Sequence, residues 1–217
     1  MKLLAIFAAA SLTGVFPLID RAPHYQFAGS DQLAFQITQG APADVFAAAS
    51  PKYPEQLYAQ GLCSKPAAFA TNTVVLIVPR ANPARINSVY DLQRDGIKLV
   101  VGAKGVPIGD YTRKLLTNLG LQTALKNVVS EEDDVKLVVA KVALGEADAG
   151  FVYLTDVKPV GNKVFRITIP AVAQPTVQYE ICIPTTTTHP QFAAAFVRKV
   201  LSKRGRTTLR AAGFGLP

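Results

Sequence analysis

The chain has 217 residues and a formal net charge of +8, with 23 Lys and Arg against 15 Asp and Glu. Hydrophobic residues make up 49% of it and charged residues 18%, which excludes an intrinsically disordered chain, because disorder needs low hydrophobicity and high charge. The positive charge favours anionic partners such as nucleic acid, an acidic membrane or a small anion. The two Cys are too few for a disulfide scaffold, and no CxxC motif or Cys/His cluster indicates a metal site. No apolar run reaches the roughly 18 residues that a membrane span needs.

The first residues have features of a secretion signal, since Met1-Lys2 precedes an apolar stretch that contains Ala-x-Ala. The stretch is short and leads straight into Ser11-Leu12-Thr13. We therefore interpret Leu3–Phe7 as a buried parallel strand, with a loop over Ala8–Thr13 at its carboxyl end. An uncleaved signal is the alternative.

Short apolar runs alternate with helical patterns along the rest of the chain, as in βα units built around a parallel sheet. This pattern predicts an α/β fold. Further strands are predicted at Tyr25–Ala28, Asp44–Ala48, Val74–Val78, Lys98–Gly102, Ala149–Tyr153, Val164–Ile167 and Val177–Ile183. Ser, Asp or Pro at the starts and Gly at the ends delimit the helices. Helices are predicted from Ser30 to Gly40, Ser50 to Gly61, Gly109 to Gly120 and Asp133 to Gly145, from His189 onward, and over a last short segment ending at Gly213.

Two proline-punctuated segments, Pro79–Pro83 and Pro170–Pro175, each follow a predicted strand. Both fit crossovers between two lobes. We expect residues 1–79 and 176–217 to form lobe I and residues 80–175 to form lobe II, each a mostly parallel sheet flanked by helices. Hinges near 79–83 and 170–175 would then leave a ligand cleft between the lobes.

Four segments place a hydroxyl or backbone N–H groups at the start of a helix that follows a strand. Ligands of open parallel sheets bind beyond the carboxyl ends of the strands, and helix N-termini attract anions. Each segment alone fits an ordinary helix start, but together they predict a small anion held by neutral donors. The segments are Ala10-Ser11-Leu12, Gly29-Ser30-Asp31, Val106-Pro107-Ile108-Gly109 and Asp134-Val135.

A larger set of motifs runs through the chain in order: Phe7–Thr13, Leu33–Phe46, Val106–Tyr111, the Asp134-Val135 helix start, Gly145–Asp156 and Gly213-Phe214-Gly215. With these motifs, nearly the whole chain resembles the molybdate-binding proteins of molybdate ABC transporters. The resemblance implies the two-lobed fold of class II periplasmic solute-binding proteins. It also implies a receptor that delivers a tetrahedral oxyanion, molybdate or tungstate, to the membrane permease of an ABC importer.

The resemblance implies that the ligand is contacted by the hydroxyls of Ser11, Ser30 and Tyr153 and by the backbone N–H groups of Ile108 and Val135. It implies no catalysis, cofactor or resident metal, because the oxyanion itself is the ligand. It further implies a monomer that binds no nucleic acid and works in the periplasm or on the extracellular face of the cell membrane, with its signal or lipoprotein leader absent from this sequence.

Several alternatives stay open at this point. The same fold also fits another small anion, such as sulfate or phosphate, or the effector-sensing domain of a transcription regulator, although no helix-turn-helix segment begins the chain. Asp31 stands where the family has Ser or Thr, and a carboxylate beside a dianion is unfavourable unless it caps its helix or meets a cation such as Arg21. Cys63 and Cys182 are either bridged or two buried thiols.

Overall fold

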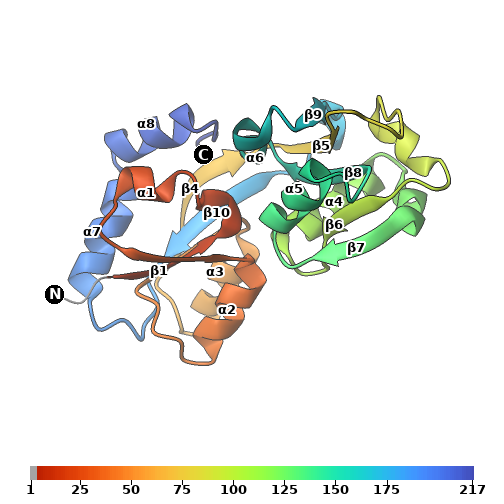
Figure 1. The fold of residues 1–217 in the computed structure, drawn as a ribbon. Helices are drawn as coiled ribbons and strands as arrows, with labels where there is room; N and C mark the ends of the chain where they lie inside the picture. Colours follow the sequence, from red (N-terminus) through yellow and green to blue (C-terminus); the bar gives the residue numbers. More distant parts are fainter. Residues whose placement is uncertain (1–3) are drawn as a thin grey trace. The chain divides into compact units, whose positions relative to one another are not determined.

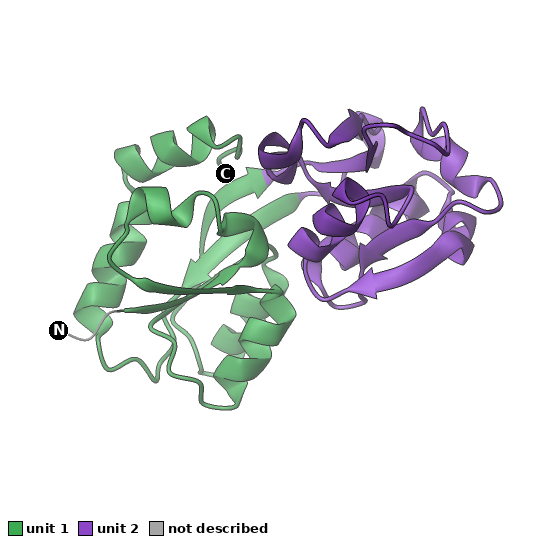
Figure 2. Ribbon diagram, in the orientation of Figure 1, with its two compact units in different colours: residues 1–71, 177–217 green, residues 72–176 purple. Residues whose placement is uncertain are grey.

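The computed structural model describes residues 4–217, which divide into two compact units, residues 4–71 with 177–217 and residues 72–176 (Figure 2). Each unit is built on its own five-stranded sheet with helices packed against it (Figure 1). The predicted α/β class is therefore confirmed. Leu3, the first residue of the first predicted strand, lies outside the described residues.

The first unit has the strand order β2-β1-β3-β10-β4. β1 runs parallel to β2 and β3, whereas β10 runs antiparallel to β3. The strands are β1 (Ala5–Ala9), β2 (His24–Ala28), β3 (Val45–Ala48), β4 (Ala67–Asn72) and β10 (Val177–Cys182). The helices are η1 (Ala10–Leu12), α1 (Phe16–Ile19), α2 (Ser30–Thr38), α3 (Lys52–Ala59), α7 (Pro190–Leu201) and α8 (Lys203–Ala211).

The second unit has the strand order β7-β6-β8-β5-β9. β6 is parallel to β7 and β8, and β5 is antiparallel to β8 and β9. The strands are β5 (Val74–Pro79), β6 (Leu99–Gly102), β7 (Val128–Glu132), β8 (Ala149–Tyr153) and β9 (Val164–Ile167). The helices are η2 (Val89–Gln93), α4 (Pro107–Asn118), η3 (Gln122–Asn127), α5 (Val135–Ala143), α6 (Leu154–Val157), η4 (Lys158–Val160) and η5 (Ala171–Ala173).

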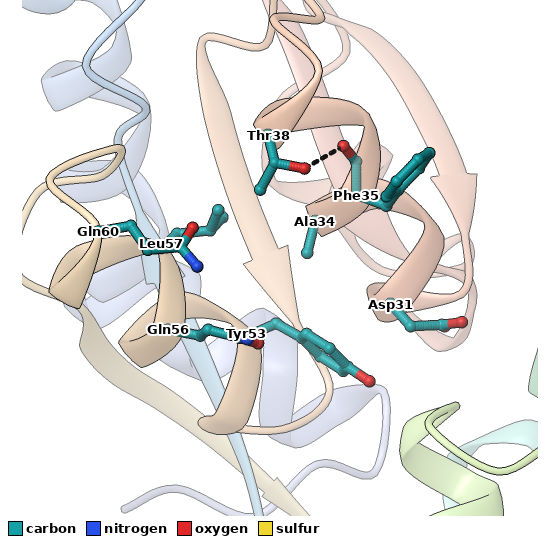
Figure 3. A pocket seen from close by; sticks show the side chains of 8 residues that line it. All are labelled: Asp31, Ala34, Phe35, Thr38, Tyr53, Gln56, Leu57 and Gln60. Atoms are coloured by element: carbon teal, nitrogen blue, oxygen red, sulfur yellow. Dashed lines mark hydrogen bonds between the residues drawn. The ribbon is translucent and has the colours of Figure 1, made fainter.

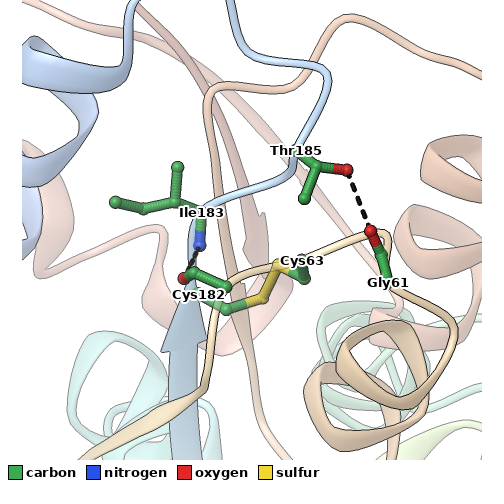
Figure 4. The surroundings of a disulfide bond; sticks show 6 residues. Gly61, Cys63, Cys182, Ile183 and Thr185 are labelled. Atoms are coloured by element: carbon green, nitrogen blue, oxygen red, sulfur yellow. Dashed lines mark hydrogen bonds between the residues drawn. A yellow bond between two sulfur atoms is a disulfide. The ribbon is translucent and has the colours of Figure 1, made fainter.

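The core of the first unit lies where α2 and α3 pack on the sheet, around Phe7, Leu33, Phe46 and Leu57. A disulfide joins Cys63, which follows α3, to Cys182 at the end of β10 (Figure 4). The question of a bridge or two thiols is thus answered in favour of the bridge. Because Cys63 and Cys182 are 119 positions apart, the bridge closes a long loop within the fold.

The division into units differs from the predicted lobe boundary at residue 79. β5 pairs with β8 and β9, so residues 72–79 belong to the second unit. At the other crossing, the second unit ends at Thr176, one residue beyond the predicted boundary. The predicted loop over Ala8–Thr13 is also shorter than expected, since Ala8 and Ala9 continue β1.

None of the helices in the described part of the chain combines the length and the apolar character that crossing a membrane requires. Within residues 4–217, no group of three or more His, Cys, Asp or Glu side chains is placed to hold a metal ion.

Candidate anion-binding site

In the first unit, Ser11 and Ser30 follow neighbouring parallel strands. β1 and β2 are in register with Ala9 opposite Ala28, so η1 and α2 begin at the same edge of the sheet. Ser11 lies in η1, and Ser30 is the first residue of α2. Both side chains are buried. The sheet topology therefore brings these two hydroxyls to its carboxyl edge.

Each of these hydroxyls already has a partner inside the first unit. Ser30 Oγ accepts a hydrogen bond from the N–H of Ala49 at 3.1 Å, and Ser11 Oγ lies 2.9 Å from the hydroxyl of Tyr179. A serine hydroxyl has one proton to donate and lone pairs that accept. Since Ser30 Oγ accepts from Ala49, its proton remains to be donated. The Ser11 hydroxyl also keeps its proton for another acceptor when the Tyr179 hydroxyl donates to it.

In the second unit, three helices begin where three parallel strands end. β6, β7 and β8 run in one direction, and α4, α5 and α6 follow them in turn. Ile108, Val135 and Tyr153 therefore all lie at the carboxyl edge of this sheet, and all three are buried.

The start of α4 lies directly against the end of β6. A Cβ on Gly109 would come within 2.2 Å of the Ala103 carbonyl oxygen, and one on Gly102 within 2.7 Å of the Gly109 nitrogen. Only glycine at both positions permits this approach. Pro107 is an early helical residue without an N–H, so the N–H of Ile108 is among the first that α4 presents.

The start of α5 is capped by Asp134. Its Oδ1 accepts the N–H of Lys136 at 2.6 Å and the N–H of Leu137 at 3.1 Å. This confirms the interpretation of the Asp133-Asp134 pair as the start of a helix. The cap does not use the N–H of Val135, which belongs to the first turn and has no acceptor within the helix.

Tyr153 ends β8 and packs its ring against that of Tyr111, with the ring centroids 6.5 Å apart in an edge-to-face arrangement. Its backbone N–H donates to Asp156 Oδ2 at 3.3 Å. The five predicted residues thus fall into two groups, with Ser11 and Ser30 in one unit and Ile108, Val135 and Tyr153 in the other.

Asp31 occupies the first turn of α2, next to Ser30. The N-cap of that helix is Gly29, which has no side chain to cap with. Asp31 and Tyr53 lie at one end of a groove between α2 and α3 (Figure 3). A carboxylate in the first turn complements the positive end of the helix dipole.

Tyr179 was not expected at this edge from the sequence. β10 runs antiparallel to β3, with Glu180 opposite Ala48, and this pairing carries Tyr179 to the place where the parallel strands end. The sequence could have indicated Tyr179 through its place near the start of an apolar strand, had that strand been recognised as antiparallel to β3.

The donors described above lie at the carboxyl edges of both sheets, where open α/β folds bind their ligands. The model of the family described as bacterial extracellular solute-binding protein matches residues 20–215. The chain belongs to this family.

Several members of the family and of its fold are similar to this solute-binding protein over most of its length. Molybdate-binding protein ModA of Mycobacterium tuberculosis is 38% identical over 99% of this chain and 85% of its own. The solved periplasmic molybdate-binding protein of Azotobacter vinelandii has a TM-score of 0.87 at 24% identity, covering 99% of both chains. The sulfate-binding protein SubI of Mycobacterium tuberculosis has a TM-score of 0.80 at 17% identity, over 99% of this chain and 86% of its own. The predicted resemblance and the predicted fold are confirmed.

Proposed function

We propose that this solute-binding protein is a receptor for a tetrahedral oxyanion, molybdate or tungstate, and that it delivers the anion to the membrane permease of an ABC importer. The observation that carries the proposal is the set of donors at the two sheet edges. In this proposal Ser11, Ser30 and Tyr153 donate through their hydroxyls, and Ile108 and Val135 through their N–H groups, to the same anion.

The polarity of the hydroxyls supports an anion without protons. Molybdate, tungstate and sulfate accept hydrogen bonds at every oxygen, whereas hydrogenphosphate must also donate one. Ser30 Oγ already accepts from Ala49, so its proton is the part of the hydroxyl that is still wholly available, and the backbone N–H groups of Ile108 and Val135 can only donate. A site made of such donors favours the fully deprotonated oxyanions over hydrogenphosphate.

The choice of molybdate rests on similarity. The relatives named molybdate-binding protein include one that is 38% identical over 99% of this chain. Sulfate is the second candidate, because the fold is shared with a solved sulfate-binding protein at a TM-score of 0.80.

The proposed setting is outside the cytoplasm, in the periplasm or on the extracellular face of the membrane. A disulfide such as Cys63–Cys182 persists in oxidising compartments and is rare in the cytosol. In this proposal the protein works as a monomer that binds its ligand, catalyses no reaction and needs no cofactor. Its partners are the anion and the permease, and it binds no nucleic acid.

Binding is proposed to close the two units about the chain segments that connect them, which the sequence predicts near residues 79–83 and 170–175. The units join at Thr71–Asn72 and Thr176–Val177, so the first hinge is proposed between β4 and β5 and not beyond β5. The radius of gyration from X-ray scattering should fall when a bound anion saturates the protein, and an unchanged value would contradict closure.

Calorimetry against molybdate, tungstate, sulfate and phosphate tests the assignment. We expect Ser30→Ala to weaken molybdate binding by about tenfold or more, since a hydrogen bond to a charged group contributes about 1.5–3 kcal/mol. Ser64→Ala is a matched control, because Ser64 Oγ also accepts one backbone N–H, that of Ile183 at 3.0 Å, but away from the sheet edge. Tighter binding of sulfate than of molybdate would overturn the choice of anion, and an absence of binding to all four would overturn the function.

A further inference from the structure

An ion pair joins a partly exposed lysine to a fully buried carboxylate in the second unit, next in sequence or by contact to two of its proposed donors. Lys136 Nζ is 2.6 Å from Asp156 Oδ1, and the Asp156 side chain is fully buried while that of Lys136 is 36% exposed. The other carboxylate oxygen, Oδ2, accepts the backbone N–H of Tyr153 at 3.3 Å. One carboxylate therefore contacts residues from the start of α5 and from the end of β8.

Both contacts involve elements that carry proposed ligand donors. Lys136 follows Val135 directly, and its own N–H is bound by Asp134 at 2.6 Å. The residue is thus held at its backbone by the cap of α5 and at its ammonium by Asp156. Tyr153 contributes the proposed hydroxyl donor and is held at its N–H by the same carboxylate.

We infer that Lys136 and Asp156 are positioning residues for the anion site, fixing the start of α5 against the end of β8 so that the Val135 N–H and the Tyr153 hydroxyl act together. This inference rests on the proposed function. Neither side chain contacts the anion in this arrangement. Their effect on affinity passes through the two donors.

The charged groups around Asp156 determine whether removing its charge should raise or lower the affinity for the anion. The charged side chains that act on it are Lys136 and, as a weaker repulsive influence, Asp134, both from the start of α5; Lys158 of the neighbouring η4 is exposed. Burial raises the pKa of the Asp156 carboxyl, and the Lys136 ammonium and the Tyr153 N–H oppose that rise. Lys136 neutralises a carboxylate that would otherwise repel a bound dianion.

Asp156→Asn separates positioning from charge. The change removes a negative charge near the anion, so on charge alone it should tighten binding. Asn keeps the shape, but an NH2 group replaces one of the two carboxylate oxygens, and because Lys136 and Tyr153 contact different oxygens, one of the two contacts is lost. If the pair positions the donors, molybdate binding measured by calorimetry should weaken by about tenfold, the effect of losing one hydrogen bond to a charged group. Unchanged or tighter binding by a folded variant would overturn the inference.

Lys136→Met provides a second readout in case the first variant does not fold. It removes the contact that joins the start of α5 to Asp156, so molybdate affinity should fall by about tenfold at low and at high salt alike. A loss that disappears at about 1 M salt, where attraction between charges is screened, would mean that Lys136 acts only by attracting the anion, and would overturn the role of the pair.

Lys126 and Asp95 form a matched control in the same unit, with Nζ 2.6 Å from Oδ1 and both side chains exposed. Asp95→Asn should leave the affinity unchanged. The wild type is measured first with the same four anions. Failure of the wild type to bind any of them contradicts the proposed function, whereas binding by the wild type and equally by Asp156→Asn contradicts only the positioning role.

Discussion

The hydroxyl of Ser11 lies 2.9 Å from the hydroxyl of Tyr179, although the two residues are 168 positions apart in the chain. Tyr179 is fully buried in β10, and its ring packs edge-to-face on Phe69 and Phe214. Because Ser11 has a single proton, it can donate to an anion only while Tyr179 donates to it. Tyr179 thus decides the direction in which the Ser11 hydroxyl points.

Tyr179→Phe should therefore weaken molybdate binding although it removes no proposed ligand group. The ring and its packing remain, but the Ser11 proton can turn away from the anion. We expect a loss of up to about tenfold in affinity by calorimetry. Tyr25→Phe is the control, since the Tyr25 hydroxyl donates to the Asp20 carbonyl at 2.6 Å within the same unit. If Tyr179→Phe binds molybdate as tightly as the wild type, the Tyr179 hydroxyl does not orient the Ser11 proton.

The disulfide should contribute to stability more than to binding. The bridge between Cys63 and Cys182 (Figure 4) closes a loop with a sequence separation of 119. Both residues are buried among apolar side chains. The chain-entropy model assigns about 4.7 kcal/mol to a loop of roughly 100 residues. Replacing both residues by Ala should lower the free energy of unfolding by several kcal/mol, of the order of 2–4 kcal/mol.

Chemical denaturation of this double variant and of the wild type measures the difference. Anion affinity, measured well below the unfolding midpoint, should be unchanged because the bridge lies away from the Ser11 and Ser30 hydroxyls along β10. The interpretation is contradicted if adding a reducing agent destabilises the double variant as much as the wild type, since the variant has no bridge to lose.

Glu180 gives stability a dependence on pH. It is 7% exposed in β10, and its Oε2 has no hydrogen-bond partner within residues 4–217. Burial raises its pKa above the ordinary value of 4.5, and the nearby Glu55 adds to the rise, whereas the Gln178 amide opposes it. The folded protein therefore holds this proton more tightly than the unfolded chain, and stability falls as the pH rises above 4.5 through the folded pKa.

Glu180→Gln should remove that loss. The amide oxygen can still accept from the Gln178 side chain, and no charge has to be buried. We expect the variant to be about 1 kcal/mol more stable than the wild type at neutral pH, with the difference vanishing near pH 4. Denaturant titrations at the two pH values measure this. Glu55→Gln, an exposed neighbour, should give a smaller gain, and a gain of equal size at both pH values for Glu180→Gln would rule out titration as its cause.

The sequence predicted several helix starts because capping residues mark them, as at Ser30 and Asp134. α4 begins at Pro107, two residues before the predicted start at Gly109, because proline is well placed in the first turn of a helix. It missed β4 and β7 for physical reasons. β4 reads AAFATN, a half-buried run of mostly small residues without clear alternation, and β7 is an edge strand that includes Ser130 and two Glu. Strand propensity is weak for such residues, and only pairing with a neighbour makes them strands.

In the candidate site too, the sequence predicted the residues that lie in local motifs but not the contacts between distant segments. Ser11, Ser30, Ile108, Val135 and Tyr153 were identified because each lies in a local motif at a strand end. The contacts of Tyr179 with Ser11 and of Asp156 with Lys136 were not predicted, because they join segments that are distant in sequence. The first contact forms because β10 pairs antiparallel with β3, and the second because β7, β6 and β8 are parallel neighbours in one sheet. No local sequence pattern encodes the order of strands in a sheet.

Asp31 is the remaining test of the anion's identity. It follows Ser30 but lines the groove between α2 and α3 with Ala34, Phe35 and Thr38, which share one face of α2, whereas Ser30 is buried against the sheet edge (Figure 3). A carboxylate on that face stabilises the helix dipole without lying beside the anion.

Asp31→Ser should therefore leave the preferred anion unchanged and alter its affinity only modestly. Asp31→Asn separates the charge from the shape, and Gln32→Ser controls for a change in the same turn. Titrations of all four proteins with molybdate, sulfate and phosphate at two pH values compare them. Tight molybdate binding by Asp31→Ser alone would mean that the native carboxylate faces the anion and that this chain evolved for a different ligand.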